Sequence, residues 1–207
     1  EMCIRDRPYD DGYTLRETKA PEGYQLDSTV HYYTLKDFTS SGNPITAYNK
    51  SVTITNTPIL GELEITKLDE ASKEKLSGAV FELYKGKIPT TGTEKEKYQA
   101  VNKNNANYEF KQEITIPDSG VAVVKKLAYG EYVLKETVAP VNHDISYELH
   151  SVVIAQQSKP VKLEVENKLS SGKLIIQKST EDGSPLANAE FELRRKDTDE
   201  KIGDNLI

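Results

Sequence analysis

Residues 13–24 read YTLRETKAPEGY, and residues 132–143 read YVLKETVAPVNH. Each copy is followed by a run of alternating apolar residues that ends in asparagine, VTITN at 52–56 and LEVEN at 163–167. The two asparagines are 111 residues apart. A repeat of this size indicates tandem domains, each as large as a β-sandwich.

The repeat continues past each asparagine into a glycine-led run that ends in lysine. These runs are GELEITK at 61–67 and GKLIIQK at 172–178, so the lysines are also 111 residues apart. In both copies the lysine lies eleven positions after the asparagine. The sequence therefore repeats a glutamate, an asparagine and a lysine at matching places.

This spacing divides the chain into one complete module and two partial ones. Residues 61–169 form a complete period and are called the central module below. Residues 8–58 match only the back part of a module (the N-terminal segment), and residues 172–207 match only the front part (the C-terminal segment). Residues 1–7, EMCIRDR, match nothing in the repeat and are interpreted as non-native sequence. The single cysteine, Cys3, lies within them and therefore gives no information about the natural protein.

Alternation with period 2 predicts which side chains point inward. In residues 61–67 the apolar face carries Leu63 and Ile65, and Lys67 lies on that same face. The same reasoning places Glu136 and Asn167 on the apolar faces of their strands. The corresponding residues of the two partial modules are Glu17, Asn56 and Lys178.

The remaining pattern predicts an all-β fold of tandem β-sandwich modules. Further strands are expected at 80–84, 108–116, 121–125 and 151–155, with turn signals between them. Residues 87–107 are rich in Lys, Thr and Asn and are expected to form a long loop with a short helical turn. After the Ala-Pro pair, the second copy has VNHDISY at 141–147 where the first has EGY, so a longer loop is expected there.

Composition excludes several classes of function. The chain of 207 residues has 33 acidic and 27 basic residues, and no basic stripe for nucleic acid is present. No apolar run approaches the length of a membrane span, so membrane contact is not expected. His31 and His150 lack further ligands at metal-site spacing, and no nucleophile elbow or phosphate loop occurs, so neither a metal, a cofactor nor an external substrate is predicted.

A polar residue at the end of a strand often marks only the point where the strand leaves the core. Repetition of all three residue types argues against that interpretation here, because a buried lysine is costly unless it is paired or chemically used. The stretches GELEITKLDE, LSGAVFELYK, EYVLKETVAP and LEVEN resemble the B-type repeats of collagen adhesins and Gram-positive pilins. These are prealbumin-like (reverse immunoglobulin-like) domains with internal isopeptide bonds.

The resemblance implies that Lys67 is the amine, Asn167 the acceptor amide and Glu136 the catalytic acid of an autocatalytic bond. The inward positions of Lys67 and Asn167 predict that their strands are neighbours in the sandwich. Burial lowers the pKa of a lysine and raises that of a glutamate, which favours a neutral nucleophile and a proton donor. A protonated Glu136 is expected to donate a hydrogen bond to the Asn167 side-chain carbonyl. Glu17, Asn56 and Lys178 are the corresponding residues without partners in this chain.

The resemblance implies a structural stalk repeat of an extracellular, cell-wall-attached adhesin or pilus-like protein, whose partners are its other modules. The alternative is a module that binds a host protein, such as one of the extracellular matrix. A binding module needs an exposed aromatic or apolar patch, and residues 87–107 with Tyr98 and the adjacent Tyr108 are the candidate for it.

Overall fold

The computed structural model describes residues 12–34, 37–41 and 47–203. The interpretation of residues 1–7 as non-native sequence falls outside the described residues. Backbone contacts divide the chain into two units, Glu1–Ser170 and Ser171–Ile207. The boundary expected between the N-terminal segment and the central module remains a prediction.

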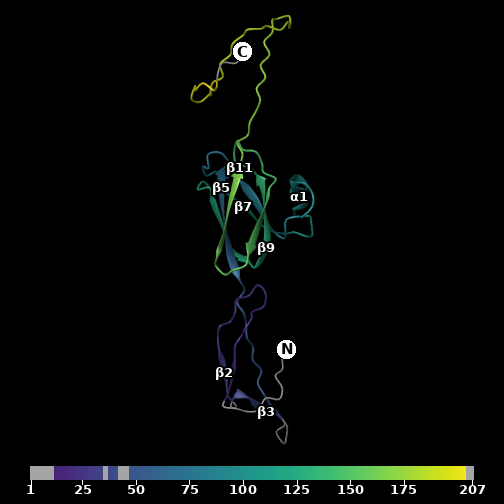
Figure 1. Cartoon of the computed structure of the whole chain (residues 1–207), viewed down its shortest axis with the longest axis vertical. Helices are drawn as coiled ribbons and strands as arrows, with labels where there is room; N and C mark the ends of the chain where they lie inside the picture. Colours follow the sequence, from purple (N-terminus) through teal and green to yellow (C-terminus); the bar gives the residue numbers. More distant parts are fainter. Residues whose placement is uncertain (1–11, 35–36, 42–46, 204–207) are drawn as a thin grey trace. The chain divides into compact units, whose positions relative to one another are not determined.

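The central module is a sandwich of two sheets (Figure 1). One sheet has the order β10-β9-β6-β7 and the other has the order β11-β5-β8. The strands are β5 (Leu60–Asp69), β6 (Val80–Lys85), β7 (Glu109–Thr115), β8 (Val121–Ala128), β9 (Gly130–Val138), β10 (Leu149–Ile154) and β11 (Pro160–Asn167). The all-β prediction for this module is confirmed.

Alternating residues of the two sheets fill the space between them. In β5 buried and half-buried residues alternate from Gly61 to Lys67, as period 2 requires. Each sheet thus contributes one apolar face, and the two faces cover each other. The buried core includes Leu63, Ile65, Phe81, Leu83, Ile116, Leu134, Val152, Ile154 and Val165.

The first and last strands of the module are hydrogen-bonded neighbours. β11 pairs with β5 in parallel, with Val165 opposite Lys67 and Asn167 opposite Asp69. The prediction that the strands of Lys67 and Asn167 are adjacent is therefore confirmed. Since the two strands are parallel, the chain enters the module at one end of the ladder and leaves it at the other.

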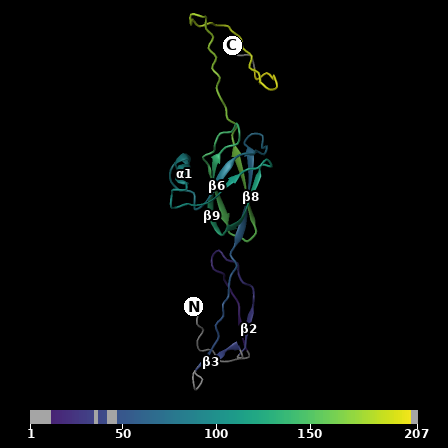
Figure 2. The same cartoon turned by 180° about the vertical axis from the view of Figure 1, so that it is seen from behind.

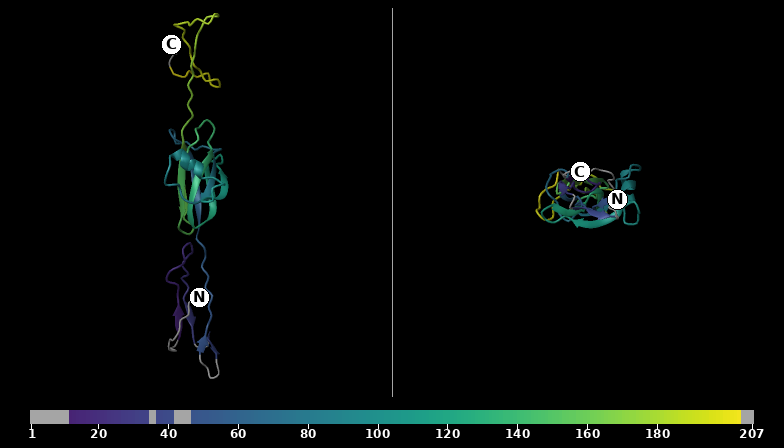
Figure 3. Two further views of the ribbon diagram at one scale, coloured as in Figure 1. Left: turned by 90° about the vertical axis from the view of Figure 1, so that its right-hand side faces the viewer. Right: turned by 90° about the horizontal axis from the view of Figure 1, so that it is seen from below.

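The loop at residues 87–107 covers the outer face of the four-stranded sheet. It contains the helix α1 (Glu94–Ala100), which begins with a capping box between Thr93 and Glu96. Figure 2 shows α1 outside the sheet, on the side of β6 and β9 and away from β8, and the right-hand view of Figure 3 shows the teal helix at the outer side of the module. A second small core forms beneath this loop from Tyr84, Val101 and Val133. β9 is consequently buried on both faces from Tyr132 to Glu136.

The strands in the described part of the N-terminal segment are short. They are β1 (Tyr13–Leu15), β2 (His31–Tyr33), β3 (Thr39–Ser41) and β4 (Ala47–Asn49), which form two antiparallel pairs. The strand predicted at residues 52–56 is wrong, because these residues form no ladder. In the central module the corresponding residues form β11, which pairs with β5, the strand that carries Lys67. Residues 52–56 are paired with no such strand.

The C-terminal segment is described up to residue 203 and has bridges but no strand within that range. The strand predicted at residues 172–178 is wrong for the same reason, since no neighbouring strand is paired with it. The turn after its lysine is nevertheless formed. The Leu186 backbone N–H donates to the Lys178 carbonyl at 2.9 Å, as that of Leu76 does to the Lys67 carbonyl at 2.9 Å.

Candidate functional site

Three strands from both sheets bring Lys67, Glu136 and Asn167 into one end of the core. Lys67 is on β5, Glu136 on β9, and Asn167 is the last residue of β11. Their exposed fractions are 0%, 1% and 2%, so the inward orientation predicted from alternation is confirmed. Two buried ionisable groups and an amide in one place call for a chemical or structural explanation.

Two backbone carbonyls hold the amine of Lys67. Its Nζ donates to the carbonyl of Leu68 at 3.1 Å and to that of Val165 at 3.0 Å. Burial lowers the pKa of Lys67 to about 8, against the opposing charges of Glu136, Glu166 and Asp69. A substantial neutral fraction of this lysine is therefore present near physiological pH.

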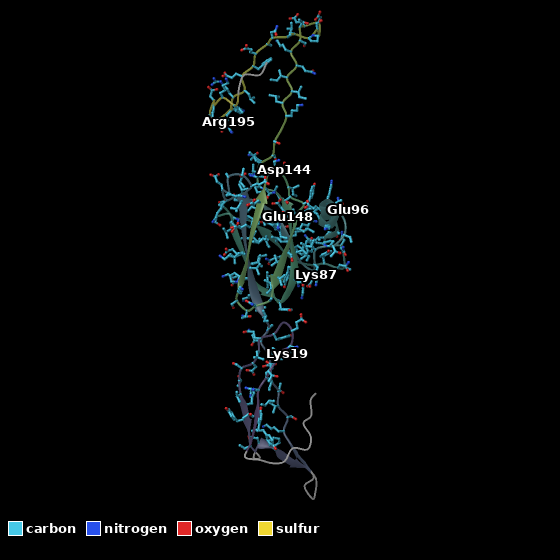
Figure 4. All side chains as sticks on the ribbon, viewed as in Figure 1. Lys19, Lys87, Glu96, Asp144, Glu148 and Arg195 are labelled. Carbon is cyan, nitrogen blue, oxygen red and sulfur yellow. The ribbon has the colours of Figure 1, made fainter. Side chains whose placement is uncertain are left out.

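Glu136 and Asn167 are hydrogen-bonded to each other and to one loop. Asn167 Nδ2 donates to Glu136 Oε2 at 2.7 Å and to the carbonyl of Asp144 at 2.7 Å. The backbone N–H of Ser146 donates to the same Glu136 oxygen at 2.9 Å. Asp144 lies at the end of the module where β11 ends (Figure 4). The loop at residues 140–147 thus closes the site.

The hydrogen bond expected from Glu136 to the Asn167 carbonyl is replaced by one from the amide nitrogen. The two hydrogens of Asn167 Nδ2 are donated to the Glu136 carboxylate and to the Asp144 carbonyl. In this orientation of the amide, Asn167 Oδ1 does not face the Glu136 carboxylate. Asn167 Oδ1 and Glu136 Oε1 are buried without a hydrogen-bond partner. Burial raises the pKa of Glu136, although the hydrogen bonds from Ser146 and Asn167 and the charge of Lys67 oppose this.

The closing loop is fastened by His143, which the sequence did not identify. His143 Nε2 lies 2.9 Å from Asp69 Oδ2, and its Nδ1 lies 2.8 Å from the Val141 carbonyl. Hydrogen bonds from the turn, first of all from the backbone of Ser72, hold the pKa of Asp69 below its usual range. No sequence signal indicated this pair, since the first copy of the repeat has Tyr24 at the corresponding position.

Comparison with known protein families decides the identity of the central module. The family described as "SpaA: Prealbumin-like fold domain" matches residues 61–169, which is more than half of the chain. The chain belongs to this family. The resemblance inferred from the repeated phrase is therefore confirmed, and so is the prealbumin-like fold.

Solved structures similar to this SpaA-family chain include proteins of two Bacillus species. The Bacillus anthracis TIE protein has a TM-score of 0.62 and 27% identity, covering 93% of this chain and 31% of its own. The major pilin subunit BcpA of Bacillus cereus has a TM-score of 0.45 and 23% identity, over 72% of this chain and 40% of its own. The chain thus spans about a third of the TIE protein, and no curated protein sequence matches it.

The N-terminal segment of this SpaA-family chain repeats the site without a lysine. Asn56 Nδ2 donates to Glu17 Oε2 at 2.7 Å and to the carbonyl of Gln25 at 3.0 Å. The backbone N–H of Asp27 donates to Glu17 Oε2 at 2.7 Å, as that of Ser146 does to Glu136. The expected length difference between the two loops is wrong, because Gln25 and Asp27 occupy the places of Asp144 and Ser146.

The candidate binding patch at residues 87–107 is largely used within the fold. The Tyr98 hydroxyl donates to the backbone carbonyl of Glu136 at 2.6 Å, and its ring packs against Tyr147. Tyr108 donates to the carbonyl of Lys87 at 3.0 Å and packs against Tyr84. These contacts do not favour the host-protein-binding alternative.

A fourth buried polar residue, Lys135, was not predicted. Its Nζ donates to the Val101 carbonyl at 2.7 Å and lies 4.1 Å from the centre of the Tyr98 ring.

The described residues contain no cluster of His, Cys, Asp and Glu that could hold a metal ion. Among these residues, no helix is long and apolar enough to cross a membrane.

Proposed function

We propose that the chain is a stalk segment of an extracellular, cell-wall-attached adhesin or pilus-like protein. In this proposal an autocatalytic isopeptide bond between Lys67 and Asn167 stabilises the central module, and other modules of the same surface protein are its partners. The observation that carries the proposal is the joint burial of Lys67, Glu136 and Asn167, with Asn167 hydrogen-bonded to Glu136 and on the strand that pairs with that of Lys67. Membership of the SpaA prealbumin-like family supports it.

The chemistry follows from the contacts of the three side chains. Neutral Lys67 Nζ attacks Cγ of Asn167 and forms the new C–N bond. The Cγ–Nδ2 bond breaks, and Nδ2 leaves as ammonia after it gains a proton. Glu136, which is hydrogen-bonded to Nδ2, gives its proton to the departing nitrogen and takes one from Nζ, so atoms and charges balance. The reaction occurs once per module and needs no further reactant.

A bond at this place suits a protein that bears load. Lys67 is on the first strand of the module and Asn167 ends the last, and these strands are parallel neighbours. A pull on the chain before Leu60 and after Asn167 would be transmitted through the new amide instead of through the β5–β11 hydrogen bonds. By analogy with a disulfide closing a loop of about 100 residues, the bond contributes roughly 4–5 kcal/mol to stability.

Single-molecule pulling on the 207-residue chain tests this function. The wild-type chain should show no extension from residues between Lys67 and Asn167, because the amide excludes them from the load path. Glu136→Ala should release that length when the sheets separate. Glu164→Ala, which changes an exposed glutamate on the outer face of β11, is the matched control and should behave as wild type. Release of the full length from the wild-type chain would contradict the proposal.

A further inference from the structure

The closing loop holds the acceptor and the acid of the site, but not the amine. The Asp144 carbonyl accepts a hydrogen bond from Asn167, and the Ser146 backbone N–H donates to Glu136. The amine of Lys67 belongs to β5, where two backbone carbonyls hold it. The position of the loop relative to β5 therefore decides how the acceptor meets the amine.

Two kinds of contact fasten this loop. On the side of β11, the Asp144 backbone N–H donates to the Lys168 carbonyl at 2.9 Å, and the Ser170 hydroxyl donates to the Asp144 carboxylate at 2.6 Å. Among the described residues, the hydrogen bond between the loop and β5 is made by His143, whose Nε2 lies 2.9 Å from Asp69 Oδ2. This contact thus joins the acceptor side of the site to the amine side.

Asp69 is a fixed anchor close to the amine. It ends β5 two positions after Lys67 and lies opposite Asn167 in the β5–β11 ladder. Its Oδ1 accepts hydrogen bonds from the backbone N–H of Ser72 at 2.7 Å and from the hydroxyl of Ser72 at 3.0 Å. These bonds, the one from the Ser72 backbone first, hold the pKa of Asp69 below its usual range, so its carboxylate is ionised.

Both ring nitrogens of His143 face hydrogen-bond acceptors. Nδ1 lies 2.8 Å from the Val141 carbonyl, and Nε2 faces the ionised carboxylate of Asp69. Neither partner can donate, so the two contacts are hydrogen bonds only when each ring nitrogen carries a hydrogen. The pair is then a charge-assisted hydrogen bond. Its side chains are only 7% and 14% exposed, which limits screening by water and salt.

We propose that His143 is a positioning residue for the isopeptide reaction. Its hydrogen bond to Asp69 fixes the closing loop, and with it the Asn167 side chain, against the strand that carries Lys67. This inference rests on the proposed function of the central module. A displacement of about 1 Å between reacting groups can slow a reaction about a hundredfold, so a loop released from β5 would react slowly.

The charge of His143 has the opposite effect on the reaction. Burial raises the pKa of Glu136, and the positive charge of His143 is among the effects that oppose this rise. Loss of the charge alone would therefore leave more of Glu136 protonated and would speed the reaction. Loss of the hydrogen bond to Asp69 would slow it. The sign of the change in rate separates a positioning role from a purely electrostatic one.

The N-terminal segment shows that this kind of loop forms without the histidine. Tyr24 occupies the place of His143 there. The next backbone N–H, that of Gln25, still donates to the Thr57 carbonyl at 2.8 Å, as its counterpart does in the central module. An aromatic side chain is thus compatible with the loop backbone, and His143→Phe is expected to fold.

The rate of ammonia loss tests the inference. Unreacted full-length chain is transferred from denaturant into native buffer, and its intact mass is followed over time. His143→Phe should react about tenfold or more slowly. His143→Gln is equally neutral but keeps an N–H donor for Asp69, and it should recover part of the rate. Ser170→Ala, which removes an exposed hydrogen bond of the loop on the side of β11, is the matched control and should react at the wild-type rate.

Two rate outcomes would overturn the inference. His143→Phe that reacts at the wild-type rate or faster would show that His143 acts through its charge or not at all. Ser170→Ala that is slowed as much as His143→Phe would show that any loosening of the loop is sufficient, without a particular role for the contact to β5.

Hydrogen exchange separates this inference from the proposed function. Glu136→Gln lacks the proton donor but keeps an oxygen for the Ser146 backbone N–H. In that chain His143→Phe should raise the exchange rate of the Ser146 N–H, whereas Ser170→Ala should not. Unchanged exchange would overturn the inference. A wild-type chain that keeps its full sequence mass, together with raised exchange, would remove the proposed function and leave the fastening of the loop by His143 in place.

Discussion

At the scale of single residues, burial changes the ionisation of Lys67 and Glu136 in opposite directions. It lowers the pKa of the lysine to about 8 and raises that of the glutamate. The reactive form, a neutral lysine with a protonated glutamate, carries as many protons as the ion pair. Its population therefore stays constant between the two pKa values and falls outside them. In the proposed reaction, shared burial therefore supplies both the neutral amine and the proton donor.

The pH dependence of bond formation follows directly. When unfolded chain that has not yet reacted is transferred into native buffer, the rate of ammonia loss should be constant between the raised pKa of Glu136 and about pH 8, and should decrease at pH values below the pKa of Glu136. Above about pH 8 it should fall about tenfold per pH unit, because Glu136 loses its proton while Lys67 gains no further reactivity. Intact mass measured over time gives this rate. A rate that kept rising above pH 9 would show that protonated Glu136 is not needed.

An unreacted module should have a pH-dependent stability that the reacted one lacks. In Asn167→Ala, the folded pKa of Lys67 remains below its unfolded value of about 10.4, so the unfolded state binds more protons between pH 8 and 10.4. The unfolding free energy should consequently rise with pH across that window, by about 3 kcal/mol. In the proposed reacted module Lys67 is an amide and does not titrate, so urea unfolding of both proteins isolates the difference. Parallel pH profiles would contradict a buried amine.

Residue positions could be predicted from the sequence only where a strand period fixes them. The alternation GELEITK places Lys67 with Leu63 and Ile65, and the structure has all three buried. The His143–Asp69 pair could not be found in this way, since the contact joins a loop residue to the last residue of β5, and the loop follows no period. The orientation of the Asn167 amide was also beyond the sequence, because the Asp144 carbonyl that orients it comes from that same loop.

At the scale of elements, strand identity depends on the neighbour as much as on the sequence. LEVEN and VTITN have the same pattern, but only LEVEN lies in a strand, β11, which pairs with β5. A strand without a ladder leaves its backbone groups unpaired, so pattern alone predicted strands at 52–56 and 172–178 incorrectly. Within the central module each predicted strand has a partner, and all of them form.

The outer loop makes one element-scale prediction. The Tyr98 hydroxyl bonds the backbone carbonyl of Glu136 beneath the loop, whereas Tyr108 bonds the carbonyl of Lys87 in a more exposed place. Tyr98→Phe should lower the unfolding free energy by about 1–3 kcal/mol because it leaves a buried carbonyl unsatisfied. Tyr108→Phe is the matched control and should cost less. If both substitutions lowered the unfolding free energy equally in urea unfolding, the hydrogen bond from Tyr98 to the Glu136 carbonyl would not be what stabilises the loop on the sheet.

At the scale of the whole molecule, one arrangement is repeated through the chain with different parts present. The central module contains acid, amide and amine, the N-terminal segment contains acid and amide, and the C-terminal segment contains the amine. The period of 111 residues revealed this organisation, because it preserves the spacing of the reactive residues while the rest of the sequence varies. The sequence predicted that β5 and β11 are neighbours but not that they are parallel, and this parallel pairing brings the two ends of the period together.

The intact mass of the purified chain, followed by a peptide map, tests the central claim most directly. The wild-type monomer should be lighter than its sequence by one ammonia, and digestion should yield a branched peptide that joins Lys67 to Asn167. Glu136→Ala should have the full sequence mass, while Glu164→Ala should show the same loss as the wild type. A wild-type chain of full sequence mass, with Lys67 and Asn167 recovered in separate peptides, would contradict the account.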